Sequence, residues 1–212
     1  MQAQLEKDRK SVLGIPYGFT DDRRFWNLKQ FPHLINCIPE LKDTPALYEF
    51  VRRVNSSGSR FATMGCERWS KGVDYPNGAT KEFGTYVDLM FDRVELASPA
   101  NCAMLVEALL QHGENLRAKD PYSDLSLIRV APQRVGFHDL NFGAWMCSTW
   151  IYGVGNSDRM AQGYRDRALA ELANVLEQVS ADVTEAHGDK GTTIFDKLSD
   201  NGSAPGRHRP GK

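Results

Sequence analysis

A histidine followed directly by a carboxylate, His138-Asp139, is the first place where this sequence could carry chemistry. An imidazole can act as a general base when a carboxylate orients it. Adjacent residues rarely face each other in that way, so Asp139 is better suited to stabilising the turn around it. We therefore expect His138 to be a loop residue, and a general-base role is the alternative.

A second candidate combines a thiol, a carboxylate and a cation in Cys66-Glu67-Arg68. A nucleophilic cysteine needs a nearby imidazole or cation that lowers the pKa of its thiol. In a strand, alternation places Cys66 and Arg68 on one face and Glu67 on the other. We expect a buried thiol beside a surface pair of Glu67 and Arg68. The alternative is an unfamiliar hydrolase or transferase site built from Glu67, Arg68, His138 and Asp88.

Two further carboxylates, Asp88 and Asp92, share one face of a predicted strand with Tyr86 and Met90. At a rise of about 3.3 Å per residue the two acids are about 13 Å apart. That is more than the roughly 5–9.5 Å that separates the carboxyl groups of a glycosidase pair. We predict a half-polar outer face of the sheet, which in a binding protein would meet a basic partner.

Large aromatic residues gather on the apolar stretch 144–154, where Trp145 lies on the opposite face from Trp150 and Tyr152. Core packing is the simpler interpretation of these side chains. If they are exposed, Trp150 and Tyr152 would be anchors of a protein interface, because interface hot spots are rich in such residues. Lysine and arginine do not alternate with them, so a stacking platform for nucleic acid is not expected.

Motifs that bind nucleotides or metals, or that mark a serine nucleophile, are absent from the chain: GxGxxG, the Walker A loop, HExxH and GxSxG do not occur. The four cysteines, Cys37, Cys66, Cys102 and Cys147, form no CxxC pair and no Cys/His set at zinc spacing. We therefore predict no cofactor and no metal, and free thiols in a reducing compartment.

The elements that must position these residues follow from apolar periodicity and helix-start signals. Pro45 after Asp43-Thr44 and Pro99 after Ser98 mark two helix starts, and Ser157 or Asp158 marks a third. A change of apolar parity after Arg93 predicts a β-bulge near Asp92-Arg93. The elements follow the order α-β-β-α-β-β-α, which predicts an α+β fold with an antiparallel sheet of about four strands and helices mainly on one face.

The chain divides into three parts by composition. Residues 1–43 form an arm with prolines and aromatics, which either wraps over the core or docks a partner. Residues 44–186 form a single α+β domain, and residues 187–212 form a disordered tail because apolar residues are scarce there. An apolar island at 192–198 would either dock elsewhere or fold back on the domain.

The overall composition is ordinary for a soluble globular protein, with 41% hydrophobic and 25% charged residues among 212 and a formal net charge of −1. Such a charge creates no field that favours nucleic acid or an anionic membrane. No apolar run is long enough to span a membrane, and the charged start of the chain lacks the apolar stretch of a signal peptide. We predict a cytoplasmic protein.

The leading functional hypothesis is a small cytosolic module that binds another protein, such as an inhibitor or immunity-type protein of bacterial or phage origin that neutralises its partner. It rests on the size of the chain and on the lack of catalytic motifs. One alternative is a hydrolase or transferase around His138 and Glu67. Another is a phage or assembly component that forms homo-oligomers through the edge of its sheet.

Overall fold

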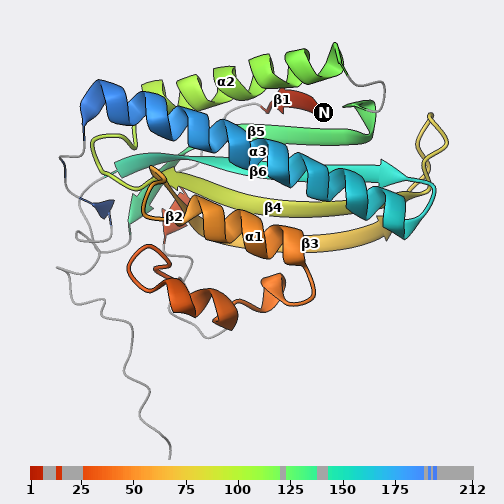
Figure 1. The fold of residues 1–212 in the computed structure, drawn as a ribbon, viewed down its shortest axis with the longest axis horizontal. Helices are drawn as coiled ribbons and strands as arrows, with labels where there is room; N and C mark the ends of the chain where they lie inside the picture. Colours follow the sequence, from red (N-terminus) through yellow and green to blue (C-terminus); the bar gives the residue numbers. More distant parts are fainter. Residues whose placement is uncertain are drawn as a thin grey trace, which may run out of the picture.

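The computed structural model describes residues 1–6, 13–15, 26–119, 123–137, 143–188, 191 and 193–194, which adopt a mixed α/β fold (Figure 1). The described strands are β1 (Gln2–Leu5), β2 (Leu13–Ile15), β3 (Phe61–Gly72), β4 (Lys81–Phe91), β5 (Ser126–Phe137) and β6 (Gly143–Gly155). The described α-helices are α1 (Pro45–Val54), α2 (Pro99–Arg117) and α3 (Asp158–His187). Short 3₁₀ helices are η2 (Pro32–Cys37), η3 (Pro39–Leu41) and η4 (Ser123–Leu125). Among these residues no helix is both long and apolar enough to cross a membrane.

The sheet has the strand order β1-β5-β6-β4-β3, and β2 also pairs with β5. Neighbours among β3, β4, β6 and β5 run antiparallel, whereas β1 and β2 run parallel to β5. The sequence-based expectation of four purely antiparallel strands is therefore wrong in count and in order. Between Pro45 and His187 the α-helices and strands follow the predicted order, α-β-β-α-β-β-α. The arm adds the two extra strands, which are too short to show a period and depend on the free edge of β5.

The starts of α2 and α3 follow the predicted signals. The Ser98 hydroxyl accepts a hydrogen bond from the backbone N–H of Asn101 at 3.2 Å, and Ser157 accepts one from Met160 at 3.3 Å. Both bonds satisfy N–H groups that the first helical turn leaves without a partner. Helix α1 begins at Pro45 after Thr44, and its buried stripe is the predicted one: Leu47, Phe50, Val51 and Val54.

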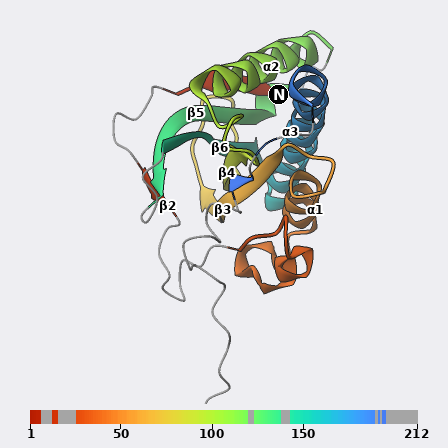
Figure 2. The same cartoon turned by 90° about the vertical axis from the view of Figure 1, so that its left-hand side faces the viewer.

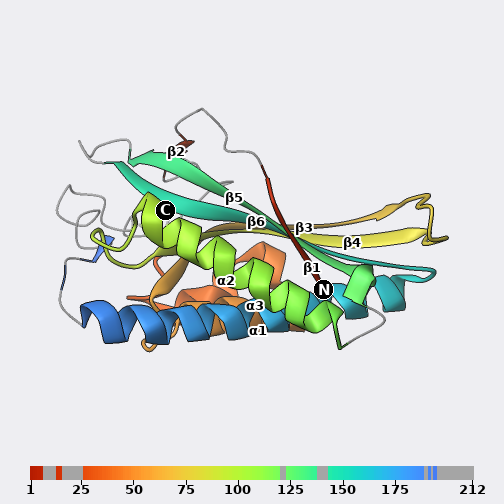
Figure 3. The same ribbon diagram turned by 90° about the horizontal axis from the view of Figure 1, so that it is seen from above.

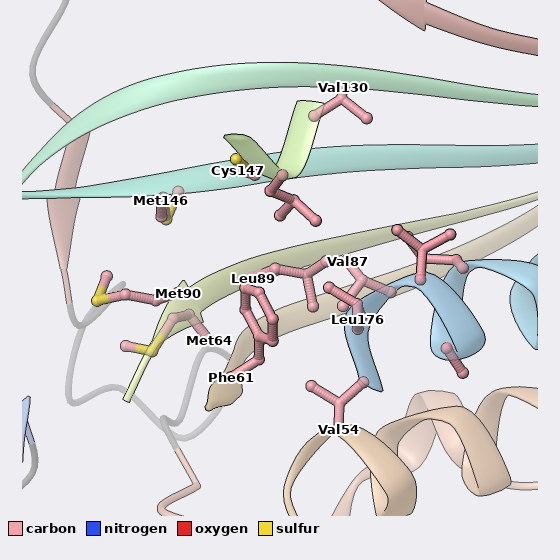
Figure 4. Packing of buried hydrophobic residues seen from close by; sticks show 14 of the residues in the cluster. Val54, Phe61, Met64, Val87, Leu89, Met90, Val130, Met146, Cys147 and Leu176 are labelled. Atoms are coloured by element: carbon pink, nitrogen blue, oxygen red, sulfur yellow. The ribbon is translucent and has the colours of Figure 1, made fainter. Parts of the chain in front are cut away.

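The three α-helices pack on one face of the sheet, and no described helix covers the other face (Figures 2 and 3). The hydrophobic core lies between the two layers. Figure 4 shows Val54 of α1, Leu176 of α3 and Val87 of β4 in this cluster, each 2% exposed or less. Because side chains alternate along a strand, the residues next to Val87 in β4 point to the helix-free face.

The β-bulge predicted near Asp92-Arg93 is not found there. The register shifts between Thr63 and Gly65 in β3, whereas β4 ends at Phe91 and the chain turns after Asp92. The parity change after Arg93 therefore reflects the end of the strand. In the predicted tail, Ile194 is 1% exposed and its N–H donates to the Asp92 carbonyl at 3.0 Å. The apolar island thus folds back on the domain at this residue.

Helix α3 rests directly on the backbone of β6. A Cβ atom at Gly153 would lie 2.1 Å from the carbonyl oxygen of Ala161 and 2.2 Å from the backbone nitrogen of Arg165. No side chain fits into that space, so a glycine at this position permits the close approach of helix and strand.

We expect Gly153→Ala to lower the free energy of unfolding by about 1–3 kcal/mol or more, because the added methyl group must push α3 away from β6. Gly163→Ala, on the exposed side of the same helix with no atom within 4 Å, is the matched control. It should raise stability by roughly 0.5–1 kcal/mol, because alanine favours helix over glycine. Urea unfolding followed by circular dichroism measures both effects. Equal stabilities of the two variants would contradict this packing.

Candidate functional site

The helix-free face of the sheet carries four aromatic side chains, which we call the aromatic surface: Trp69, Tyr86, Trp150 and Tyr152. The strand register brings them together, because Tyr86 pairs with Trp150 and Gly84 pairs with both Trp69 and Tyr152. All four side chains are partly exposed. The sequence-based prediction that Trp150 and Tyr152 share a face, with Trp145 on the other, is confirmed by this register.

The rings of the aromatic surface pack in pairs. The Tyr86 and Trp150 centroids are 5.4 Å apart at an interplanar angle of 48°, and those of Trp69 and Tyr152 are 5.6 Å apart at 69°. These are favourable tilted and edge-to-face geometries. The Arg129 guanidinium lies 5.5 Å from the centre of the Tyr152 ring, within the range of a cation–π contact. The aromatic surface is therefore an ordered cluster with a cation at its border.

A buried carboxylate, Glu82, holds one end of this surface. Its Oε1 accepts a hydrogen bond from Trp69 Nε1 at 3.0 Å and lies 3.0 Å from Lys71 Nζ, and its Oε2 accepts from the Tyr75 hydroxyl. Burial works to raise the pKa of Glu82, but the bonds from Tyr75, Trp69 and Lys71 outweigh it and leave the pKa below its usual value. The same contact raises the pKa of Tyr75 to about 12. Glu82 is therefore a carboxylate that fixes the Trp69 indole.

A second buried carboxylate, Asp88, holds the other end. It is 0% exposed, and its Oδ1 accepts hydrogen bonds from the Tyr86 hydroxyl and from Ser148 Oγ, the latter at 2.5 Å. Gln133 Nε2 donates to Ser148 Oγ at 2.7 Å. The prediction that Asp88 lies on an exposed acidic face is therefore wrong. Strand alternation shows which residues share a face, but it does not show whether neighbouring strands cover them.

The other residues of that predicted face are also placed differently. Met90 is 1% exposed and belongs to the core cluster. Asp92 follows the end of β4, and its Oδ2 lies 3.5 Å from Lys29 Nζ. Among these four residues, Tyr86 is the one that belongs to the aromatic surface. A binding role for Met90 and Asp92 stays a prediction.

The candidate catalytic residues do not meet in one place. Glu67 and Asp88 point to the helix-free face, whereas Arg68 and Cys66 lie on the helix side of β3, and His138 lies outside the described residues. The pKa of the Cys66 thiol is raised to about 12. Burial is the largest cause, and the nearby carboxylates of Glu40 and Asp88 add to it. This thiol therefore stays protonated at neutral pH. In the described part of the chain, no cluster of His, Cys, Asp and Glu could hold a metal ion.

Sequence reasoning missed the residues that order this surface: Glu82, Tyr75, Ser148, Gln133 and Arg129. A signal was present in β4, where Glu82, Tyr86 and Asp88 share one face and the other face carries Phe83, Thr85 and Val87. Such a row of polar groups in a strand predicts one polar face. Apart from Tyr86 on the same strand, the partners of Glu82 and Asp88 come from a turn and from other strands.

Comparisons of the chain with models of known protein families, with curated proteins and with solved structures found no match.

Gly84 leaves the space in which the Trp69 indole lies, since a Cβ atom there would be 2.1 Å from the ring. We expect Gly84→Ala to displace the indole, break its bond to Glu82 and lower the free energy of unfolding by about 1–3 kcal/mol. Gly72→Ala, on the same hairpin with no atom within 4 Å, is the control. Tryptophan fluorescence and urea unfolding measure the change. An unchanged emission spectrum in Gly84→Ala would refute this contact.

The lowered pKa of Glu82 makes a prediction about acid stability. A carboxylate with a depressed folded-state pKa stabilises the fold fully above its unfolded pKa, and this contribution is lost as pH falls through the folded value. We therefore expect the stability advantage of the wild type over Glu82→Gln to shrink as pH falls from neutral through and below the usual glutamate pKa of 4.5. Glu67→Gln, an exposed change on the same face, is the control in unfolding experiments across this range. A constant difference between wild type and Glu82→Gln would contradict the ionised state.

Proposed function

We propose that this protein is a binding module that holds a partner protein against the aromatic surface on the helix-free face of its sheet. One observation carries the proposal: four partly exposed aromatic rings, two of them bonded to buried carboxylates, lie on a face that no described helix covers. Tyrosine, tryptophan and arginine are the residues in which interface hot spots are richest. Arg129 beside Tyr152 completes that composition.

The order of the surface also favours binding. Bonds from the Trp69 indole and the Tyr86 hydroxyl to carboxylates hold both rings before any partner arrives. Less side-chain entropy is then lost on association, so more of the contact energy contributes to affinity. The border of the surface carries both signs of charge, with exposed Glu67 and Lys71 on β3. This is the polar rim that a protein interface needs around its aromatic centre.

An inhibitor or immunity-type role is the form of binding that we propose, because neutralising a partner requires a rigid face and no catalytic machinery. The assembly alternative would use β3, which is one of the edge strands of the sheet. Charged residues on its outer half, Glu67, Arg68 and Lys71, oppose pairing with another strand. The hydrolase or transferase alternative lacks a described constellation that would favour it.

The test is affinity capture of the tagged full chain from lysate of its own source cells, followed by quantitative mass spectrometry and by calorimetry with the purified partner. We expect one stoichiometric protein partner, whose affinity falls about tenfold or more in Tyr152→Ala and in Trp150→Ala. Met160→Ala removes an apolar side chain that is 43% exposed on α3, in the helix layer, and should leave the affinity unchanged. Circular dichroism confirms that each variant folds.

Three outcomes would contradict the proposed binding function. The first is a partner that folded Tyr152→Ala and Trp150→Ala retain with wild-type affinity, which places the interface elsewhere. The second is a concentration-dependent mass with no other partner, which favours the homo-oligomer. The third is a turnover in a substrate screen that His138→Ala abolishes, which favours the enzyme.

A further inference from the structure

A cleft of about 410 Å³ lies at the other face of the sheet, between the start of α1, the β3–β4 pair and the first half of α3. Its volume is in the range of small-molecule sites. The side chains that matter for its chemistry are Arg68, Ser70, Phe83, Gln162 and Arg165, together with Asp43 at the α1 end. Trp69 of the aromatic surface also borders the cleft, but Tyr86, Trp150 and Tyr152 do not line it, so a ligand of this cleft is distinct from the partner proposed above.

Arg165 is the buried cation of the cleft, at 1% exposure. Its Nε and Nη2 donate to Asp166 Oδ1 at 2.8 and 2.5 Å. No described residue accepts a hydrogen bond from its Nη1. A buried guanidinium is stable only when its donors are paired or reach water. Asp166 balances the charge of Arg165, but the Nη1 donors stay available to a ligand.

Arg68 is the exposed cation of the cleft. It extends from β3 on the helix side of the sheet, and no described residue lies within ion-pair distance of it. Two neutral donors, the Ser70 hydroxyl and the Gln162 amide, also line the cleft and make no hydrogen bond to another described residue. Phe83, which pairs with Ser70 in the register, adds an apolar contact.

We propose that this cleft binds a carboxylate group, with Arg68 as its ion-pair partner. The Arg165 Nη1, Gln162 and Ser70 donors then complete its hydrogen bonds, and Phe83 contacts the attached carbon chain. A planar guanidinium matches a carboxylate, which it can bind through two parallel bonds. Asp43 adds a negative charge to the lining, so a single negative charge fits better than a phosphate dianion.

Two sources can supply such a group: a small organic acid, or an acidic side chain of a peptide. The experiment is a ¹H–¹⁵N NMR titration of the labelled full chain, at constant ionic strength, with succinate, with the peptide acetyl-Glu-Glu-Glu-amide and with inorganic phosphate. We expect saturable shifts at Arg68, Ser70 and Gln162 with succinate or the peptide. Tighter binding of the peptide identifies an acidic segment as the source, whereas succinate binding as tightly as the peptide identifies a small acid.

Arg68→Gln should raise the dissociation constant of the carboxylate probe about tenfold or more, because it removes a charge-assisted bond. Arg159→Gln removes the same charge from an exposed position of α3 outside the cleft lining and should change nothing. Both residues are exposed, so both variants should fold. The proposal is overturned if neither carboxylate probe gives saturable shifts in the millimolar range. It is also overturned if Arg68→Gln binds like the wild type, or if phosphate binds more tightly at these residues.

Discussion

The pairing of β4 with β6 is the constraint on which the rest of this structure depends. In one register it sends Val87 and Ile151 toward the helices and places Tyr86 and Trp150 on the opposite face. A slip of one residue would exchange the two faces and expose the core. Gly153 then decides how closely α3 can lie on β6. The hydrophobic core and the aromatic surface are therefore two consequences of one strand pairing.

The buried carboxylates show how the polar face is stabilised. Removing Glu82 and Asp88 from water costs free energy unless their oxygens accept hydrogen bonds. Here the bonds come from an indole, two phenol hydroxyls and a serine, so each acid orders the ring that bonds to it. The hydrogen bonds that offset the desolvation of these acids therefore also hold the aromatic surface in one conformation. Stability and recognition are linked in these residues.

Strand β3 connects the two candidate sites. Trp69 contributes to the aromatic surface and also borders the cleft, and Arg68, its neighbour in the chain, lines the cleft from the helix side. Successive side chains of a strand point to opposite faces, so one edge strand can serve two surfaces of different chemistry. One surface is aromatic and ordered by internal bonds. The other offers the Arg68 guanidinium, the Arg165 Nη1 group and the Gln162 amide, none of which has a partner among the described residues.

Local signals in the sequence were sufficient to predict the helix starts at Ser98 and Ser157, the buried stripe of α1 and the shared face of Trp150 and Tyr152. Each depends on residues within one or two turns of a helix, or on simple alternation along a strand. Only the tertiary structure decided that β1 and β2 join β5, that Asp88 is buried and that a cleft lies beside Arg68. Asp88 and Ser148 are 60 residues apart in the chain. Burial and hydrogen bonding at such separations depend on which elements pack together, and no local pattern contains that information.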